Sequence, residues 1–339
     1  MAALHALFPV ASDAETPKAE PPARVVMAEA AGVVVKFKPV AAAVRTLVDR
    51  GIKQLAGTNR LEAAWRALLT TNGVYATNEL IGIKVAAAAR EGGGARVETA
   101  AALIESLLAA GLAPRQIVVW DRLAADLERA GFAALEKHYK VRVAGAAEMG
   151  YEASAFYDSP FIGEPAPTDL EFGKKGEGIG RRSHVTKLLT REITRVIHVA
   201  PLHIRQRAGV SGHLTGLALD TLDNTRRFDR DQNWFEQAVV EILALPAFDN
   251  RVALCVTDAL ICQYQGEQET LLHYCTAPGQ LWFSRDPVAL DVLAVRELER
   301  LRAIAKLPLM EPRLVLYENA ALMRHGVNDL KRIRVERAP

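Results

Sequence analysis

Apolar positions recur along the chain in two patterns, a helical period and short continuous runs. Apolar residues three to four positions apart predict amphipathic helices, whereas short runs rich in β-branched residues predict buried strands. The helical pattern covers 40–55, 59–69, 97–110, 123–130, 183–189, 211–222, 235–245 and 287–304. The strand pattern covers 33–37, 80–85, 117–120, 195–199, 252–256, 281–283 and 333–335, the last as an edge strand. Strands and helices therefore alternate with short connections, which is typical of parallel βαβ units.

The helix expected over 287–304 has the clearest start signal. Asp286 can accept hydrogen bonds from the first unpaired N–H groups of the helix, and Pro287 suits its first turn. A helix cap therefore explains Asp286 without any chemistry. Asp291 lies five residues further on and does not share the face of Asp286, so the two carboxylates do not form a pair.

The length of the chain and the order of these elements predict an α/β fold. The 339 residues allow one large α/β domain or two domains, and 50% apolar with 24% charged residues is ordinary for a globular protein. We expect a mixed or mainly parallel sheet flanked by helices, with room for a division into two lobes around a cleft. The expected parts are a flexible leader (1–24), a first lobe (25–150), an irregular segment (151–182) and a second lobe (183–339).

The segment 151–182 differs in composition from the rest of the chain. It is rich in residues that interrupt regular structure, namely Pro160, Pro165, Pro167, Gly173, Gly176, Gly178 and Gly180. Irregular segments of this length are uncommon in compact domains and often carry function. We expect either an irregular excursion or a β-hairpin flap, which is also the candidate docking loop for a protein partner or a second copy of the chain.

The charge balance and the leader restrict the partners and the compartment. Lys plus Arg number 42 and Asp plus Glu number 40, so a net charge of +2 gives no general reason to bind nucleic acid or anionic membranes. No apolar run approaches the roughly 20 residues of a membrane span. The leader lacks the basic start of a signal peptide. The cytoplasm is the default, and export stays open because a trimmed signal leaves such a remnant.

Three cysteines argue against the common cysteine-based sites. The number of cysteines is odd, and no two of them have the C-x-x-C spacing; they are Cys255, Cys262 and Cys275. This excludes the usual zinc ribbon and the usual ferredoxin-type cluster, so no iron–sulfur cluster is expected from this chain. The plain interpretation is three reduced, mostly buried thiols.

The first candidate site is the glycine loop that follows the strand containing Lys84. Gly92, Gly93 and Gly94 precede a predicted helix, whose first N–H groups and dipole favour an anion, and Lys84 and Arg96 add positive charge. We therefore expect these five residues to bind a cofactor or an anionic ligand. The loop matches neither a Walker A motif nor G-x-G-x-x-G, so a plain flexible loop is the alternative.

The second candidate is the histidine pair His203 and His213, ten residues apart after the strand 195–199. Ligands of open α/β sheets bind beyond the carboxyl ends of strands. Two imidazoles there can bind a divalent metal or share acid–base work, so both are candidate catalytic residues and candidate metal ligands. The spacing does not fix a geometry, and the alternative is a structural, hydrogen-bonding role.

The third candidate is Asp258, close after the strand 252–256. A carboxylate in this place can face a ligand, hold a metal or orient a histidine, as carboxylates behind metal-binding histidines do. The alternative is that Asp258 caps the next turn.

Several of these segments together resemble a known family. The matching blocks are 82–85, 117–122, 196–203, 208–213, 256–260 with Gly266, and 284–291. The ordered set is similar to the bacterial and archaeal family called domain of unknown function 362. The resemblance implies an α/β fold and, in some relatives, an appended ferredoxin-like module with iron–sulfur clusters, for which this chain lacks the cysteines. It departs from the family at Ala86, where relatives often have Asn, and at Leu217-Ala218, where they usually have Lys-Asn.

The favoured hypothesis is an enzyme or cofactor-handling protein that acts on a small anionic ligand, with metal assistance an open question. Lys84 would pair with an anionic oxygen, and His203, His213 and Asp258 would act together around the ligand. The alternatives are a non-catalytic binding or assembly protein and, from the iron–sulfur relatives alone, an accessory protein of a redox system. The substrate, the metal and the oligomeric state are not predicted.

Overall fold

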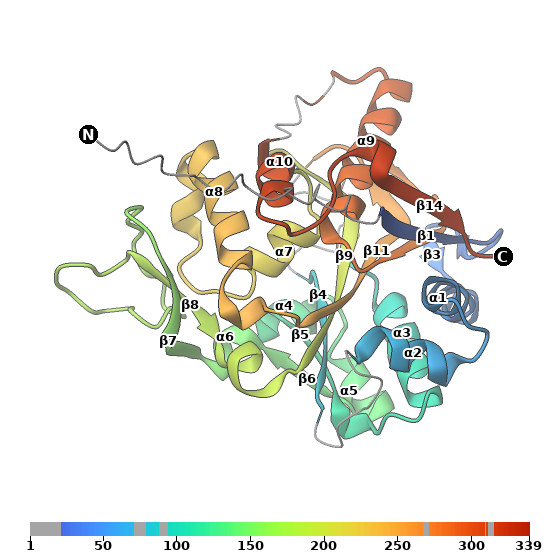
Figure 1. Ribbon diagram of the computed structural model, residues 1–339, viewed down its shortest axis with the longest axis horizontal. Helices are drawn as coiled ribbons and strands as arrows, with labels where there is room; N and C mark the ends of the chain where they lie inside the picture. The colour runs from blue at the N-terminus through green and yellow to red at the C-terminus, as the bar shows by residue number, and fades with distance from the viewer. Residues whose placement is uncertain (1–21, 71–78, 88–93, 267–270, 309, 311–314) are drawn as a thin grey trace, which may run out of the picture.

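The computed structural model describes residues 22–70, 79–87, 94–266, 271–308, 310 and 315–339. Within these residues the centre of the protein is a mixed sheet of ten strands (Figure 1). Eight strands cross the sheet in the order β14, β1, β13, β11, β9, β4, β5 and β6, with β10 beside β9 and β12 beside β11. Their bounds are β1 Ala23–Glu29, β4 Ile81–Val85, β5 Ile117–Asp121, β6 Arg142–Gly145, β9 Arg195–Arg205, β10 Gly209–Val210, β11 Val252–Gln263, β12 Cys275–Thr276, β13 Gln280–Ser284 and β14 Ile333–Arg337.

The strands β11, β9, β4, β5 and β6 run parallel to one another. β13 is antiparallel to both β11 and β1, and the edge strand β14 is parallel to β1. The segment 25–150 supplies four strands of this sheet, β1 (except its first two residues), β4, β5 and β6. The segment 183–339 supplies the other strands of the sheet. Both segments that were expected as lobes therefore contribute strands to one sheet.

Helices cover both faces of the sheet (Figure 1). One face carries α1 Ala41–Ala56, α2 Leu61–Leu69, α3 Val97–Ala109, α4 Ala124–Arg129 and α5 Ala134–Tyr139. The other face carries α7 His213–Leu219, α8 Gln232–Leu243, α9 Pro287–Ile304 and α10 Val315–Leu322, while the short α6, Ala146–Met149, follows β6. The predicted α/β fold, a mixed and mainly parallel sheet flanked by helices, is confirmed. No helix in the described part of the chain has the length and apolar content that crossing a membrane requires.

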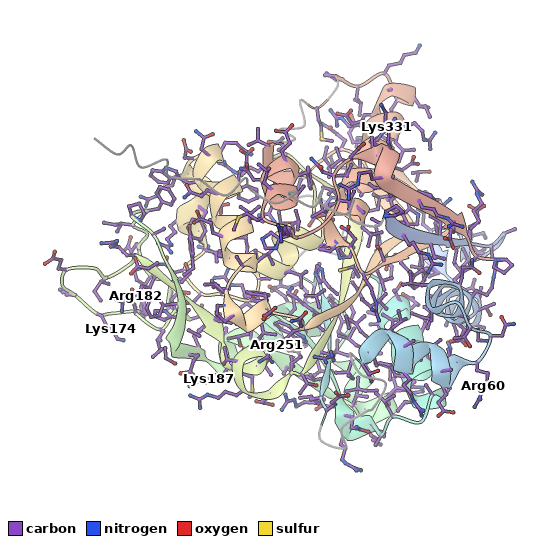
Figure 2. The ribbon with its side chains drawn as sticks, in the orientation of Figure 1. Arg60, Lys174, Arg182, Lys187, Arg251 and Lys331 are labelled. Carbon is purple, nitrogen blue, oxygen red and sulfur yellow. The ribbon has the colours of Figure 1, made fainter. Side chains whose placement is uncertain are left out.

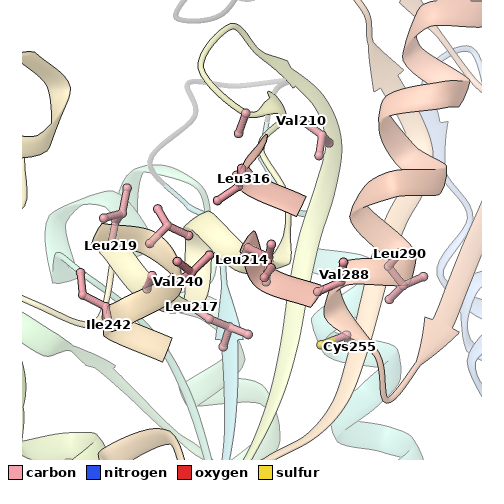
Figure 3. Close-up of a cluster of buried hydrophobic side chains, with 14 of the residues drawn as sticks. Val210, Leu214, Leu217, Leu219, Val240, Ile242, Cys255, Val288, Leu290 and Leu316 are labelled. Atoms are coloured by element: carbon pink, nitrogen blue, oxygen red, sulfur yellow. The ribbon is translucent and has the colours of Figure 1, made fainter. Parts of the chain in front are cut away.

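The sheet separates two hydrophobic cores because side chains alternate along its strands. On β9, Val196 belongs to the core under α7–α10 and Ile197 to the core under α1–α5. Figure 3 shows the first core, where Leu214 of α7, Val240 of α8 and Leu290 of α9 come together. Fully burying such a side chain contributes about 1.5–3 kcal/mol. This packing holds the short α7 against the sheet.

Local signals place the ends of the longer helices. The Asp286 side chain accepts a hydrogen bond from Ala289 N with Pro287 in the first turn, so the helix predicted over 287–304 is confirmed. Asp231 caps α8 in the same way. Helix α1 ends at Gly57, whose φ of 68° is left-handed and favours glycine.

The helix predicted over 183–189 is wrong. The segment forms β8, Arg182–Thr186, followed by a π-helical turn, Leu188–Glu192. β8 pairs with β7, Tyr151–Asp158, in a two-stranded antiparallel ribbon. The short apolar run at 183–189 has no period long enough to separate strand from helix, and its partner strand lies far away in the sequence.

The leader and the first predicted strand also differ from expectation. Ala23 and Arg24, placed in the leader, belong to β1 and pair with β14, whereas 1–21 lies outside the described residues. The run at 33–37 forms only a small hairpin of β2, Val34–Val35, and β3, Lys38–Pro39, beside the main sheet.

The segment 151–182 forms a hairpin flap, the second of the two predicted alternatives. Its strands β7 and β8 are joined by the loop 159–181, which extends to the left of the sheet in Figure 1. The labelled side chains of Lys174 and Arg182 lie along it in Figure 2, and that of Lys187 lies at its base, directly after β8. The flap is anchored by Arg227, which is fully buried and donates hydrogen bonds to two serine hydroxyls and to carbonyls of the flap.

The anchoring role of Arg227 gives a first prediction. Arg227→Met leaves one buried carbonyl, that of Tyr157, and two partly buried carbonyls without this donor, and a buried acceptor left unsatisfied costs about 1–3 kcal/mol. We expect a lower urea midpoint and faster proteolysis within 159–181. The control is Arg230→Met, because Arg230 is exposed and contacts the flap only at 3.5 Å, to the Ile162 carbonyl. Equal stability of the two variants would contradict the anchoring role.

Candidate functional site

A buried lysine lies between two carboxylates at the carboxyl edge of the parallel strands. Lys84 precedes the last residue of β4, and Asp121 is the last residue of β5, the neighbouring strand. Asp220 ends helix α7 above them. The Lys84 ammonium lies 3.0 Å from Asp121 Oδ1 and 3.4 Å from Asp220 Oδ2. Three segments far apart in the chain thus meet at one ammonium group.

The burial of this cluster is uneven, and that decides which group reaches solvent. The side chains of Lys84 and Asp121 are 0% and 2% exposed, whereas that of Asp220 is 33% exposed. Burial alone would lower the pKa of Lys84, but the charges of Asp121 and Asp220 outweigh it and raise that pKa. Lys84 therefore stays an ammonium, and Asp220 is the member of the cluster that an approaching molecule meets.

One backbone hydrogen bond and one aromatic ring fix the cluster further. Asp121 Oδ2 accepts a hydrogen bond from Ala87 N, which holds the chain where it leaves β4. The Trp120 ring lies with its centre 5.6 Å from the Lys84 ammonium, within the range of a cation–π contact.

A pair of histidines lies next to Lys84 on the same face of the sheet. Lys84 and His198 are partners in the β4–β9 register. His198 Nδ1 lies 3.0 Å from His213 Nδ1, and His213 Nε2 lies 3.0 Å from Thr257 Oγ1. The pair therefore links β9 and β11 to the first turn of α7.

Both imidazoles are neutral. Burial lowers the pKa of His213 to about 3. Burial, followed by the charges of His213 and Lys84, lowers the pKa of His198 well below its usual value. One Nδ1–H therefore donates a hydrogen bond to the other, unprotonated Nδ1. His198 Nε2 has no hydrogen-bond partner among the described residues and lies against Gly216, where a Cβ atom would sit 2.8 Å from it.

The start of α7 is held by Asp291 of α9. Its two carboxylate oxygens accept hydrogen bonds from the N–H groups of His213 and Leu214. Gly212 leaves no room for a side chain, because a Cβ atom there would lie 2.2 Å from Asp291 Oδ1. Burial raises the pKa of Asp291 to about 7 against these two hydrogen bonds.

Asp258 and Arg96, predicted in different sites, meet at the start of α3. Asp258 Oδ2 lies 2.8 Å from both Arg96 N and Thr99 Oγ1. The helix N-terminus that was predicted to hold a ligand anion thus holds a carboxylate of the protein itself. Asp258 caps this distant helix, whereas the alternative named for it was a cap of the next turn. Burial raises the pKa of Asp258, whereas Arg96 and the hydrogen bonds lower it.

The structure does not gather the predicted residues around one cavity. Strand alternation places Thr257, and with it His213, on one face of β11 and Asp258 on the other. His203 is engaged elsewhere, with Nε2 3.3 Å from the Gly266 carbonyl. Lys84 pairs with two protein carboxylates, and its role toward a ligand anion stays a prediction.

The remaining predictions for this region concern metal and the glycine loop. Among the described residues, no group of three or more His, Cys, Asp or Glu side chains is arranged to hold a metal ion. His203 and His213 contact different partners and form no pair. Gly92 and Gly93 lie outside the described residues, and Gly94 lies just before α3.

Three residues of this edge were not predicted as site residues: Asp121, Arg122 and His198. A signal existed for Asp121 and Arg122, because they directly follow the strand predicted over 117–120 and so obey the same strand-end rule as Asp258. His198 lies inside a predicted strand and did not stand out. Asp220 was noted at the far end of the predicted helix 211–222, as an acidic residue that could act with the histidine pair.

Arg122, directly after β5, also contacts the segment that follows α7. Its Nη1 donates to Thr225 Oγ1 at 2.8 Å, and its side chain is 23% exposed. Asp223 accepts hydrogen bonds from the N–H groups of His184 and Leu170. The segment 220–225 is therefore bound on one side to the end of β5 and on the other to the flap.

Comparisons with known proteins add little to this geometry. No protein-family model matches the chain, and no curated protein matches it. Among solved structures, the crystal structure of a Thermotoga maritima protein aligns with a TM-score of 0.38 and 10% sequence identity. The alignment covers 79% of this chain and 60% of that chain, so this chain spans less than two thirds of that protein.

The buried ion cluster gives a second prediction. Lys84→Met leaves Asp121 as an uncompensated buried charge, which costs about 3–5 kcal/mol. We expect a large fall in the free energy of unfolding, measured with urea, and partial recovery in the double variant Lys84→Met/Asp121→Asn. Lys137→Met, at an exposed position, is the control. A double variant no more stable than Lys84→Met would argue against a charge effect.

The Asp291 carboxyl gives a third prediction, on pH. Its pKa is raised to about 7 in the folded protein, so the unfolded chain loses this proton first as the pH rises. The contribution of Asp291 therefore makes the free energy of unfolding fall as the pH rises from about 4 to about 7, by at most about 1.4 kcal/mol per pH unit. We expect Asp291→Asn to flatten the pH dependence of the urea midpoint in this range. An unchanged slope would show that Asp291 titrates normally.

Proposed function

We propose that this protein is an enzyme that acts on a small anionic ligand at the carboxyl edge of β4 and β5. The observation that carries the proposal is the Lys84 ammonium, wholly buried between two carboxylates of which only Asp220 reaches solvent. A buried ion pair is weak evidence for stability, because apolar residues of similar volume are often as stabilising. Buried ionisable groups with shifted pKa values occur preferentially at functional sites, and the pKa of Lys84 is raised.

In this proposal the three charged residues have different roles. Asp220 faces the ligand and exchanges a proton with it, as a general base does. Lys84 holds the Asp220 carboxylate in position, and Asp121 holds Lys84. His198 and His213 are positioning residues in this arrangement, since both are buried and neutral, and they keep α7 and thus Asp220 in place.

Arg122 takes over the anion-binding role that was first assigned to Lys84. It directly follows Asp121, it keeps part of its side chain exposed, and its Nη1 donates to the neutral hydroxyl of Thr225. A guanidinium can bind a carboxylate or a phosphate through two parallel hydrogen bonds. The anionic group of the ligand would therefore lie over Arg122 and its reacting group over Asp220.

A fourth prediction tests the anion partner with acetate and inorganic phosphate as probes. We expect at least one of them to bind, and Arg122→Gln to weaken that binding about tenfold or more, by isothermal titration calorimetry. Arg115→Gln is the matched control, because Arg115 is exposed and precedes β5, whereas Arg122 follows it. Equal binding by both variants would show that Arg122 does not bind the probe anion.

The catalytic part needs a separate measurement. A panel of small phosphate and carboxylate esters is followed for proton release or uptake, with wild type and Asp220→Asn. We expect turnover of at least one compound, and a loss of about 10²–10⁴-fold in the variant without loss of probe binding. Full turnover by Asp220→Asn would end the proposal, and binding without any turnover would support the non-catalytic alternative.

A further inference from the structure

The flap places two buried polar atoms without hydrogen-bond partners near Arg122. These are Tyr151 Oη and Asp169 Oδ1, and neither has a hydrogen-bond partner among the described residues, although Asp169 Oδ1 forms a long ion pair with Arg122. The two residues are 3% and 7% exposed. An unsatisfied buried polar atom costs about 1–3 kcal/mol, and in a native protein each one calls for an explanation, such as a ligand.

Asp169 is held so that one oxygen is satisfied and the other is not. Its Oδ2 accepts a hydrogen bond from Ala166 N at 2.7 Å, which fixes the carboxylate in the flap loop. Its Oδ1 lies 4.0 Å from Arg122 Nη2, too far for a hydrogen bond. An oxygen atom about 2.8 Å from each of the two atoms would bridge them. That oxygen must accept from Arg122 and donate to Asp169.

Tyr151 lies in the same surroundings at the start of β7. Burial raises the pKa of its phenol well above the usual value, Arg122 lowers it, and Asp223 and Asp169 raise it further. The phenol is therefore protonated and lies within electrostatic reach of both Arg122 and Asp169. The chain just before it also contacts Arg122, because Ala147 N donates to the Arg122 carbonyl at 2.9 Å. In the arrangement proposed below, the Tyr151 hydroxyl would add a donor to the bridging oxygen.

We propose that Arg122, Tyr151 and Asp169 form a subsite for a hydroxyl group of the ligand. The inference rests on the proposed function and names its substrate class: small anions that carry a hydroxyl next to the anionic group. A hydroxyl can donate to Asp169 and accept from Arg122 at the same time. An ammonium group can only donate, and Arg122 would repel it.

Because Tyr151 and Asp169 belong to 151–182, the flap forms part of the ligand site in this proposal. Its attachment supports that role. Leu170 N, directly after Asp169, donates to Asp223 Oδ2, and Asp223 belongs to the segment that ends at the Arg122 partner Thr225. The position of Asp169 is thus tied to the position of Arg122.

The test compares glycolate with acetate, which carry the same charge and differ by one hydroxyl. We expect wild type to bind glycolate at least fivefold more tightly than acetate, by isothermal titration calorimetry. Tyr151→Phe should reduce this ratio to within twofold while leaving acetate binding unchanged. The matched control is Tyr157→Phe, because Tyr157 lies on the same strand but its hydroxyl donates to Glu241; its ratio should stay as in wild type.

Each outcome has one meaning. Acetate binding that depends on Arg122, with glycolate no tighter, overturns the hydroxyl subsite and leaves the proposed function standing. A glycolate preference that survives Tyr151→Phe, or that is lost equally in Tyr157→Phe, also overturns it. Binding of inorganic phosphate without binding of glycolate overturns the hydroxyl subsite alone. Failure of wild type to bind acetate, glycolate and inorganic phosphate at millimolar concentration counts against the proposed function and therefore against both.

Discussion

The ammonium of Lys84 determines how the carboxyl edge of the sheet is built. It joins β4, the end of β5 and the end of α7, and each partner is needed because an unpaired buried charge costs several kcal/mol. Asp121 extends the constraint to Ala87 N, where the chain leaves β4. The position of Asp220, the exposed member, is therefore set by groups that never meet the solvent.

The sequence predicts the fold well because most of its signals are local. The helix 287–304 is bounded by Asp286 and Pro287, and its bounds agree with the structure. The strands β9 and β11 extend to Arg205 and Gln263, beyond the predicted ends at 199 and 256. Polar residues such as His203 and Asp258 interrupt their apolar runs, so pattern alone ends these strands too early.

The site is less predictable because its contacts join distant parts of the chain. The strand-end rule selected Asp258, but its partner Arg96 is 162 positions away, and their contact forms a helix cap. The partners of Lys84 lie 37 and 136 positions away. No spacing in the sequence encodes such pairs, and they appear only when β4, β5 and α7 are placed side by side.

Helix α7 is fastened at both ends by charged groups of other elements. Asp291 of α9 holds its first N–H groups, and Lys84 holds Asp220 at its end. Seven residues of helix span only about 10 Å, so α7 is a short, rigid connection between α9 and β4. A shift of α9 by even one ångström would therefore move α7, and with it Asp220. Substitutions in the packing beneath α9 should therefore disturb the edge of the sheet more than their distance from it suggests.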